Sequence, residues 1–173
     1  GEDRAPAQGS DSVSREWYRD GRSPWQPCVS PGWQQVQAKW YFEVDLGKML
    51  QGAPASPSDR EVPYLRALHV QWDGVRMNDP PTMWASPTEI EDLRVVPGDL
   101  LVCEGGEVGR AAIVQEAPPR DCIIQNALHR VRGRKGGSVG FLRYVLMHAT
   151  AQGWFDVLCN RATIAHFTAE KFG

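Results

Sequence analysis

The chain has 173 residues, of which 42% are hydrophobic and 23% are charged. These proportions are ordinary for a globular domain, so they exclude a chain that is disordered throughout, and no run of about 18 apolar residues is present to span a membrane. The formal net charge is −2, whereas a domain that binds nucleic acid usually carries a basic excess.

Residues 1–30 have the composition of a flexible or loosely packed leader. They are rich in Pro, Gly and Ser and show little hydrophobic periodicity, so they can bury only a small surface. Trp17, Tyr18 and Trp25 are the groups that we expect to pack against the rest of the chain. Residues 1–14 lack the apolar segment of a signal peptide. We therefore expect a leader over 1–30 and one domain over 31–173.

The cysteines and histidines show no metal-binding spacing. Free thiols in a reducing cytoplasm are the interpretation we prefer over a zinc site or a disulfide framework, because no C-x-x-C pair is present among Cys28, Cys103, Cys122 and Cys159. The histidines form neither H-x-x-x-H nor H-E-x-x-H, and we expect His69 and His129 to have structural roles.

The first half of the domain is predicted to contain two strands. Aromatic and β-branched residues predict a strand over 36–44, followed by one helical turn over 46–50. A polar Pro/Gly/Ser loop over 52–61 leads to a second strand at about 65–71, and Asp73-Gly74 is a turn signal.

The second half is predicted to contain a capped helix, three strands and a longer helix. Ser86, Pro87 and Glu89 form a capping box that starts a helix ending near Leu93. Strands are expected over 99–104, 110–115 and 122–131, with a tight glycine turn over 105–109. An apolar stripe predicts a helix over 139–152, and shorter helices are expected over 154–159 and from Thr168. The order of elements predicts an α+β fold with a twisted, mostly antiparallel sheet.

The small net charge hides two oppositely charged segments. Residues 110–143 contain seven basic residues and two acids, whereas residues 81–107 contain six acids and one arginine. Arg130 and Arg132 alternate on one face of a predicted strand, and Arg134 and Lys135 follow in a loop. Such a strip suits DNA phosphates, and a solvated strand edge is the equally weighted alternative.

Three carboxylates near the glycine turn invite a comparison with acid–base or metal-dependent nuclease sites. The candidates are Asp99, Glu104 and Glu107, but the lysine of the nuclease pattern is absent. A solvated turn is therefore the preferred interpretation. A nucleophilic pair of Cys103 or Cys122 with His129 has no sequence pattern to support it.

Two alternative functions remain open at this point. Asp79-Pro80-Pro81, preceded by Asn78, is similar to the D-P-P-aromatic motif of DNA amino-methyltransferases, but Thr82 stands at the aromatic position and no glycine-rich loop for a methyl donor is present. The other alternative is a protein-interaction module in which exposed tryptophans, Trp17, Trp25 and Trp33, contact a partner.

The order of short motifs over residues 31–173 resembles a target recognition domain of the specificity (S) subunit of type I restriction-modification enzymes. The succession is Pro31-Gly32-Trp33, Gln51-Gly52, Pro63-Tyr64-Leu65-Arg66, Pro97-Gly98-Asp99-Leu100-Leu101-Val102, Gly105-x-x-x-Gly109-Arg110-Ala111-Ala112-Ile113, Gln125-Asn126-x-Leu128-His129-Arg130-Val131-Arg132, Phe141-Leu142-x-Tyr144 and Ala162-Thr163-x-x-x-Phe167.

The resemblance implies a noncatalytic protein that reads one half of a bipartite DNA target, without a cofactor or a metal. The implied partners are double-stranded DNA and the modification and restriction subunits of the complex, in the cytoplasm. The irregular stretches 51–66 and 70–84 are expected to read bases, because Arg pairs with guanine and Asn or Gln with adenine in the major groove. The candidates are Arg60, Arg66, Gln71, Arg76 and Asn78.

Overall fold

A computed structural model of the chain describes residue 32 and residues 36–155. Residues 37–155 belong to one compact unit, and the description that follows concerns that unit. Several predicted features lie outside the described residues. They are the leader over 1–30 with its boundary at residue 31, most of the helix predicted over 154–159, and the helix predicted from Thr168. The first two residues of the helix predicted over 154–159, Trp154 and Phe155, are described and are helical.

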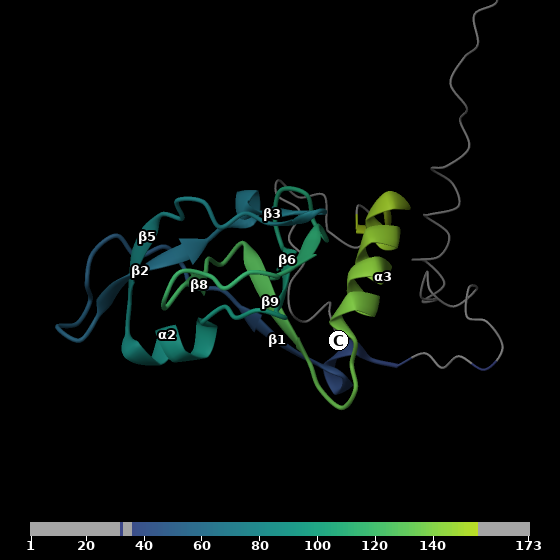
Figure 1. Cartoon of the computed structure of the whole chain (residues 1–173), viewed down its shortest axis with the longest axis horizontal. Helices are drawn as coiled ribbons and strands as arrows, with labels where there is room; N and C mark the ends of the chain where they lie inside the picture. Colours follow the sequence, from purple (N-terminus) through teal and green to yellow (C-terminus); the bar gives the residue numbers. More distant parts are fainter. Residues whose placement is uncertain (1–31, 33–35, 156–173) are drawn as a thin grey trace, which may run out of the picture. The chain divides into compact units, whose positions relative to one another are not determined.

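The larger sheet has four antiparallel strands in the order β1-β9-β6-β7 (Figure 1). They are β1 (Phe42–Leu46), β9 (Leu128–Gly133), β6 (Leu100–Cys103) and β7 (Ala111–Ile113). The β6–β7 connection contains the predicted glycine turn, in which Gly106 and Gly109 adopt φ of 77° and 84°. Glycine is required there because other residues are strained at positive φ.

A second sheet has three strands in the order β5-β2-β8. They are β5 (Thr82–Ala85), β2 (Arg60–Leu65) and β8 (Ile123–Ile124). Strand β2 pairs with β5 antiparallel through its first half and with β8 parallel through its last two residues. A two-stranded hairpin, β3 (Val70–Gln71) and β4 (Gly74–Val75), turns at Trp72-Asp73, one residue before the predicted Asp73-Gly74.

Two apolar cores lie on opposite sides of β2 and β8. Ile123 packs with Val62 and the residues of β5 in one core, whereas Ile124 packs with Leu65 and the residues of β6 in the other. Successive side chains of a strand point to opposite faces, so a short strand that is apolar at consecutive positions can serve both cores. This arrangement explains why the Ile123-Ile124 pair is completely buried.

Within residues 36–151, the α-helices α2 and α3 flank the sheets. Helix α2 (Pro87–Leu93) starts with the predicted capping box, since the Ser86 hydroxyl accepts a hydrogen bond from the Glu89 amide and the Glu89 carboxylate accepts one from the Ser86 amide. Helix α3 (Val139–Ala151) packs against β7 and β9, and it ends at Gln152 before Gly153, whose φ is 69°. Together with the sheets, these helices confirm the α+β class.

Several predicted boundaries are wrong. The strand expected over 36–44 begins only at Phe42, because Ala38–Trp40 form a 3-10 turn, η2. The helical turn expected over 46–50 is absent: Leu46 ends β1, and Lys48 forms an isolated bridge with Gln125. The strand expected over 65–71 is instead β2 over Arg60–Leu65, the 3-10 turn η3 (Ala67–His69) and β3.

The predicted strand over 122–131 is divided into β8 and β9, which belong to different sheets. The division occurs at the polar pair Gln125-Asn126, where the Asn126 amide donates to the Lys48 carbonyl and the Leu128 amide to the Gln125 carbonyl. These bonds turn the chain from the smaller sheet to the larger one. Hydrophobicity alone does not show this division, because both halves are apolar and buried.

Candidate functional site

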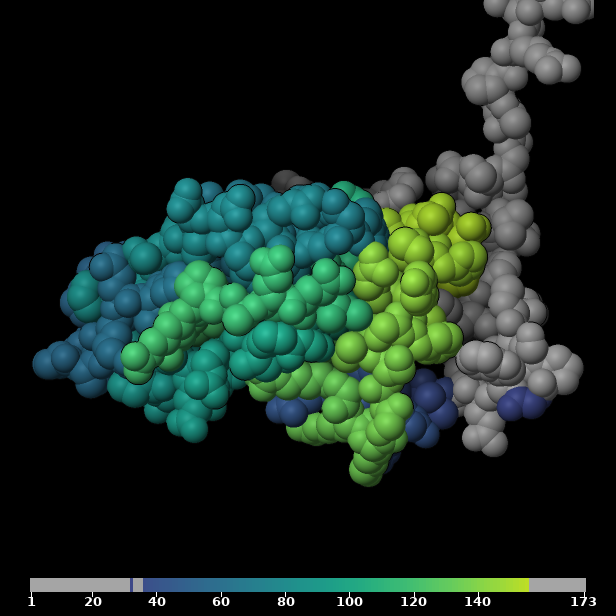
Figure 2. Space-filling model, viewed as in Figure 1, coloured from purple at the N-terminus to yellow at the C-terminus, as the bar shows by residue number. Residues whose placement is uncertain are grey.

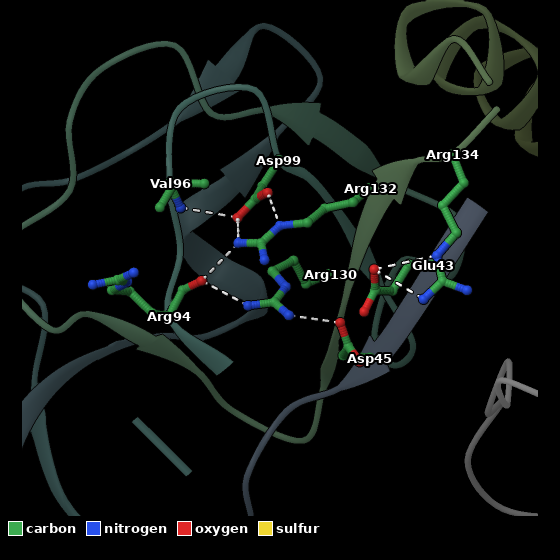
Figure 3. A network of polar contacts seen from close by, with 8 residues as sticks. All are labelled: Glu43, Asp45, Arg94, Val96, Asp99, Arg130, Arg132 and Arg134. Carbon is green, nitrogen blue, oxygen red and sulfur yellow. Dashed lines mark hydrogen bonds and ion pairs between the residues drawn. The ribbon is translucent and has the colours of Figure 1, made fainter. Parts of the chain in front are cut away.

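The basic strip of β9 is neutralised by acids from two other parts of the fold, β1 and the segment before β6 (Figure 3). Arg130 is only 3% exposed, and its guanidinium donates to Asp45 of β1 at 2.6 Å and to the Arg94 carbonyl at 2.6 Å. The predicted phosphate contact of Arg130 would require this buried charge to leave Asp45 and the Arg94 carbonyl, with which it is already paired. A buried arginine of this kind fixes β9 against β1 and the segment before β6.

Arg132 and Arg134 are also paired. Arg132 forms a two-point ion pair with Asp99, with N–O distances of 2.6 and 3.0 Å, and Asp99 is almost fully buried. This pairing raises the pKa of Arg132 above its ordinary value. Arg134 lies 3.0 Å from Glu43 of β1, and both side chains are partly exposed. The two oppositely charged sequence segments thus meet in space at Arg132 and Asp99, and much of the apparent basic patch is cancelled.

Lys135 has a different environment from the three arginines. It is exposed in the turn between β9 and α3, and its φ is 48°. In Figure 1 this turn forms the lower end of the unit, whereas the β3–β4 hairpin is at its upper side. Of the four predicted phosphate ligands, Lys135 and Arg134 are therefore the ones whose charged groups reach solvent most readily.

Four of the five predicted base-reading residues belong to one continuous stretch of the chain, residues 66–78, which we call the hairpin segment. It comprises η3, the β3–β4 hairpin and the chain that follows. Arg66, Arg76 and Asn78 are exposed, and Gln71 is half-buried. In Figure 2 the blue-teal surface of this part of the chain borders the yellow-green surface of α3.

Internal hydrogen bonds hold the side chains of the hairpin segment in place. The Gln71 amide donates to the Leu68 carbonyl at 2.9 Å, and Arg76 forms an ion pair with Asp73 at 2.7 Å. The Arg66 amide donates to Nδ1 of His69 at 3.0 Å. Burial is the main cause that lowers the pKa of His69 below its ordinary value, so this imidazole is a neutral acceptor at pH 7.

Arg60 lies apart from the hairpin segment, at the start of β2. It forms an ion pair with Asp121 at 3.3 Å, and Arg120 approaches the same carboxylate at 3.8 Å. The side chain of Arg120 is 93% exposed, and sequence reasoning did not select it. A signal was present in Pro118-Pro119-Arg120-Asp121, since a charged pair after two prolines is typical of a projecting turn.

The three carboxylates near the glycine turn point to separate partners, so they do not form an acid–base pair. Asp99 pairs with Arg132, and Glu104 lies 3.8 Å from Nε2 of His129. Glu107 accepts hydrogen bonds from Arg110 and from the indole of Trp72. The expectation of a solvated turn is wrong for Asp99 and Glu104, which are buried. It fails because each acid has a basic partner distant in sequence.

The Asp79-Pro80-Pro81 motif leads into the smaller sheet. The Pro81 carbonyl accepts a hydrogen bond from the Tyr64 amide at 2.9 Å, and the Thr82 hydroxyl donates to Glu61 at 2.6 Å. These groups therefore serve strand pairing between β2 and β5. The tryptophans of the interaction-module alternative, Trp17, Trp25 and Trp33, lie outside the described residues.

Two of the four cysteines can be described, and both are free and buried. Burial raises the pKa of Cys122 to about 12 and also raises that of Cys103. A thiol becomes a good nucleophile only as the thiolate, so neither group is prepared for nucleophilic chemistry. Within residues 36–155, no group of three or more His, Cys, Asp or Glu could hold a metal ion, and no helix is long and apolar enough to cross a membrane.

No protein-family profile matches the sequence, and no curated protein matches it significantly. Solved structures do match. A structure of a type I restriction-modification system, concerned with complex assembly and conformational transition, has a TM-score of 0.59 and 16% identity and covers 94% of this chain. The HsdS subunit from Thermoanaerobacter tengcongensis has a TM-score of 0.51, 18% identity and 83% coverage. The type I S subunit from M. genitalium has a TM-score of 0.50, 14% identity and 83% coverage.

The chain spans about a third of the length of these matching chains, namely 38%, 32% and 34%. The resemblance to type I specificity subunits that the motif order predicts is therefore confirmed at the level of the fold. The α+β arrangement described above is one that occurs within such subunits.

Proposed function

We propose that this chain is a noncatalytic domain that recognises a DNA sequence, one half of a bipartite target, for a type I restriction-modification complex. The fold carries the proposal: 94% of the chain aligns with a component of a type I system at a TM-score of 0.59. The ordered motifs of the sequence lead to the same family independently of that alignment. Because a fold hosts many functions, the site must supply the further argument.

The hairpin segment is the proposed base-reading element. It presents arginine and amide side chains on an exposed surface, and these groups pair with guanine and adenine edges in the major groove. Arg60 contributes from the start of β2. The internal partners of these residues, Asp73 and Asp121, hold the guanidinium groups before DNA arrives. Pre-ordered side chains lose less conformational entropy on binding, which favours recognition.

Contacts to phosphates are proposed for Arg134 and Lys135, whereas the charge of Arg132 is taken up by its pair with Asp99. Two such contacts give weak nonspecific affinity, since binding to the DNA backbone grows with the number of neutralised phosphates. This weakness fits a domain that works together with modification and restriction subunits in the cytoplasm. Methylation and cleavage would come from those subunits, and no catalytic residue or cofactor is assigned to this chain.

The methyltransferase alternative is less well supported. Its proline motif is occupied in strand pairing through the Pro81 carbonyl and the Thr82 hydroxyl. The chain also folds like a component of specificity subunits. Methyl transfer to DNA by the purified chain with S-adenosylmethionine alone would establish that alternative against the proposal.

A complex reconstituted with the cognate modification subunits tests the base-reading assignment. The Arg60→Ala plus Arg76→Ala variant is expected to alter the methylated sequence or to weaken binding to the cognate target. Lys39→Ala, which removes an exposed charge from η2, is the control and should change neither. An unchanged sequence and an unchanged affinity in the double variant would show that these arginines do not read bases.

A further inference from the structure

The β3–β4 hairpin cannot hold its own position. Each of its strands has only two residues, and its pairing consists of Val70 with Val75 and Gln71 with Gly74. An isolated two-stranded hairpin is marginally stable in water, even when its strands are longer than these. Groups outside the hairpin must therefore fix where its side chains point.

Three polar side chains from outside the hairpin segment hold its backbone and its turn. The indole Nε1 of Trp72, at the hairpin turn, donates to the Glu107 carboxylate at 2.9 Å. The other oxygen of that carboxylate accepts from Arg110 at 2.8 Å, and Arg110 also donates to the Ala67 carbonyl at 3.1 Å. Arg143 of α3 donates to the Trp72 carbonyl.

These contacts join the hairpin segment to the framework. Glu107 lies in the β6–β7 turn, Arg110 immediately precedes β7, and Arg143 lies in the second turn of α3. Strands β3 and β4 and helix α3 all pack against β7, so the three side chains act around one strand. The hairpin turn is thus held at Trp72 by Glu107 and Arg143, and the backbone of η3 is held at Ala67 by Arg110.

We infer that Glu107, Arg110 and Arg143 are positioning residues that determine DNA sequence preference through the orientation of the hairpin segment, without contacting bases. The inference rests on the proposed function. Arg66, Gln71 and Arg76 discriminate bases only when their donors and acceptors meet base edges in one geometry. Val70 and Val75 keep the two strands packed on the core, so release of Trp72 would let the turn and its side chains take several orientations. The preference among sequences would then fall while attraction to phosphates persisted.

Selection from a pool of random double-stranded DNA tests this inference, with the full chain used alone and together with its partner subunits. Affinities are then measured for the selected sequence and for its single-base-pair variants. We expect Glu107→Ala and Arg143→Met each to reduce discrimination at one or more base pairs by about tenfold, within the range that one mismatch typically costs. Nonspecific affinity and its salt dependence should stay as in the original chain.

Conservative and matched variants separate positioning from general stability. Glu107→Gln keeps an oxygen that can accept from Trp72, so it should retain most of the preference that Glu107→Ala loses. Trp72→Phe removes the indole donor and should lower discrimination, whereas the same change at Trp84 in β5 should not. A merely structural role would lower the melting temperature and weaken all DNA sequences equally, and that result would overturn the inference.

The proposed function and the positioning role predict different failures. If the unmodified chain selects no sequence, alone or with its partners, the proposed function is wrong. If it selects a sequence and Glu107→Ala, Arg143→Met and Trp72→Phe select that sequence with the same discrimination, the positioning role is wrong and the proposed function stands.

Discussion

The ion pair of Arg132 with Asp99 joins a half-buried guanidinium to a buried carboxylate. Two N–O contacts bind the guanidinium to a carboxylate that is only 2% exposed, and that carboxylate also accepts a hydrogen bond from the Val96 amide. Removing the arginine would leave a buried charge without its partner, which is costly. We therefore expect the pair to contribute mainly to folding.

This arrangement predicts unequal effects of two similar substitutions. Arg132→Gln should lower the free energy of unfolding by about 2 kcal/mol, because Asp99 stays buried and partly paired. Arg134→Gln should lower it by less than about 1 kcal/mol, since Arg134 and Glu43 are both solvated. Urea unfolding at pH 7 measures both values. Equal effects would show that the burial of Asp99 is unimportant.

The buried thiol of Cys122 allows a chemical prediction. Its pKa is raised to about 12 by burial, so almost no thiolate is present at pH 8. In the folded chain, iodoacetamide should modify the peptide that contains Cys122 at least ~100-fold more slowly than in the urea-unfolded chain. Mass spectrometry of digested samples measures both rates. Similar rates in the two states would contradict the described burial.

At the scale of elements, helix α2 depends on one carboxylate that serves two purposes. Glu89 completes the capping box with Ser86, and it accepts from Lys48 Nζ at 2.5 Å. The bond from Lys48 is the largest cause that holds the pKa of Glu89 below its ordinary value of 4.5. The helix is thus fastened to the chain after β1 as well as capped.

The lowered pKa predicts a pH-dependent contribution to stability. Ionised Glu89 is favoured in the folded state, so its contribution is complete above about pH 4.5 and is lost as the pH falls through the lower folded-state pKa. The stability difference between the original chain and Glu89→Gln should therefore shrink below pH 4.5. Glu91→Gln, on the exposed side of the same helix, is the control. A difference that stays constant from pH 7 to pH 3 would contradict this assignment.

Close packing at the end of β1 predicts a severe effect at one glycine. A Cβ atom on Gly47 would lie 2.2 Å from the Gln125 carbonyl oxygen, whereas one on Gly52 would meet nothing within 4 Å. Gly47→Ala should therefore destabilise the fold by more than about 2 kcal/mol, and Gly52→Ala should have little effect. Thermal unfolding of both variants compares them, and equal melting temperatures would refute the close approach of the two segments.

The sequence predicted well those elements whose signals are local. The capping box at Ser86, the glycine turn at Gly106 and Gly109, and the apolar stripe of α3 each lie within one short window. Boundaries that depend on distant pairing were missed. The division of 122–131 into β8 and β9 is set by bonds to Lys48 and by pairing with β2 and β6, and no window of sequence contains those partners.

Prediction of the candidate site fails for the same reason wherever a residue's partner is distant in the sequence. Exposed arginine and amide side chains of the hairpin segment could be selected by composition and order. The burial of Arg130 could not, because its partner Asp45 is 85 residues away in the chain. The bond from Trp72 to Glu107 was missed for the same reason.

At the scale of the whole molecule, the net charge of −2 follows from composition alone and does not show how the charges are paired inside the fold. The acids of β1 and of the segment before β6 neutralise the arginines of β9, which leaves Lys135 and partly paired arginines on the surface. We therefore expect the chain alone to bind nonspecific DNA weakly. Its selectivity would come from the hairpin segment, and its affinity from the complex.

The salt dependence of DNA binding by the complex tests whether the phosphate-contacting residues are separate from the base-reading residues. Each phosphate contact contributes about 0.9 to the slope of log K against log salt concentration. Arg134→Ala plus Lys135→Ala should therefore reduce that slope by roughly 1 to 2 without changing the preferred sequence. Lys39→Ala should leave both properties unchanged. An altered sequence preference in the double variant would place these residues among the base-reading groups.

The most direct test of DNA recognition is methylome sequencing of host cells with and without the coding region of this chain. The proposed function predicts a split methylated motif in the cells that carry the region, and loss or alteration of that motif when the region is deleted. Restoring the region with Arg60→Ala plus Arg76→Ala should change one half of the motif and leave the other half intact. An identical methylome in all these cells would contradict the assignment of this chain to target recognition.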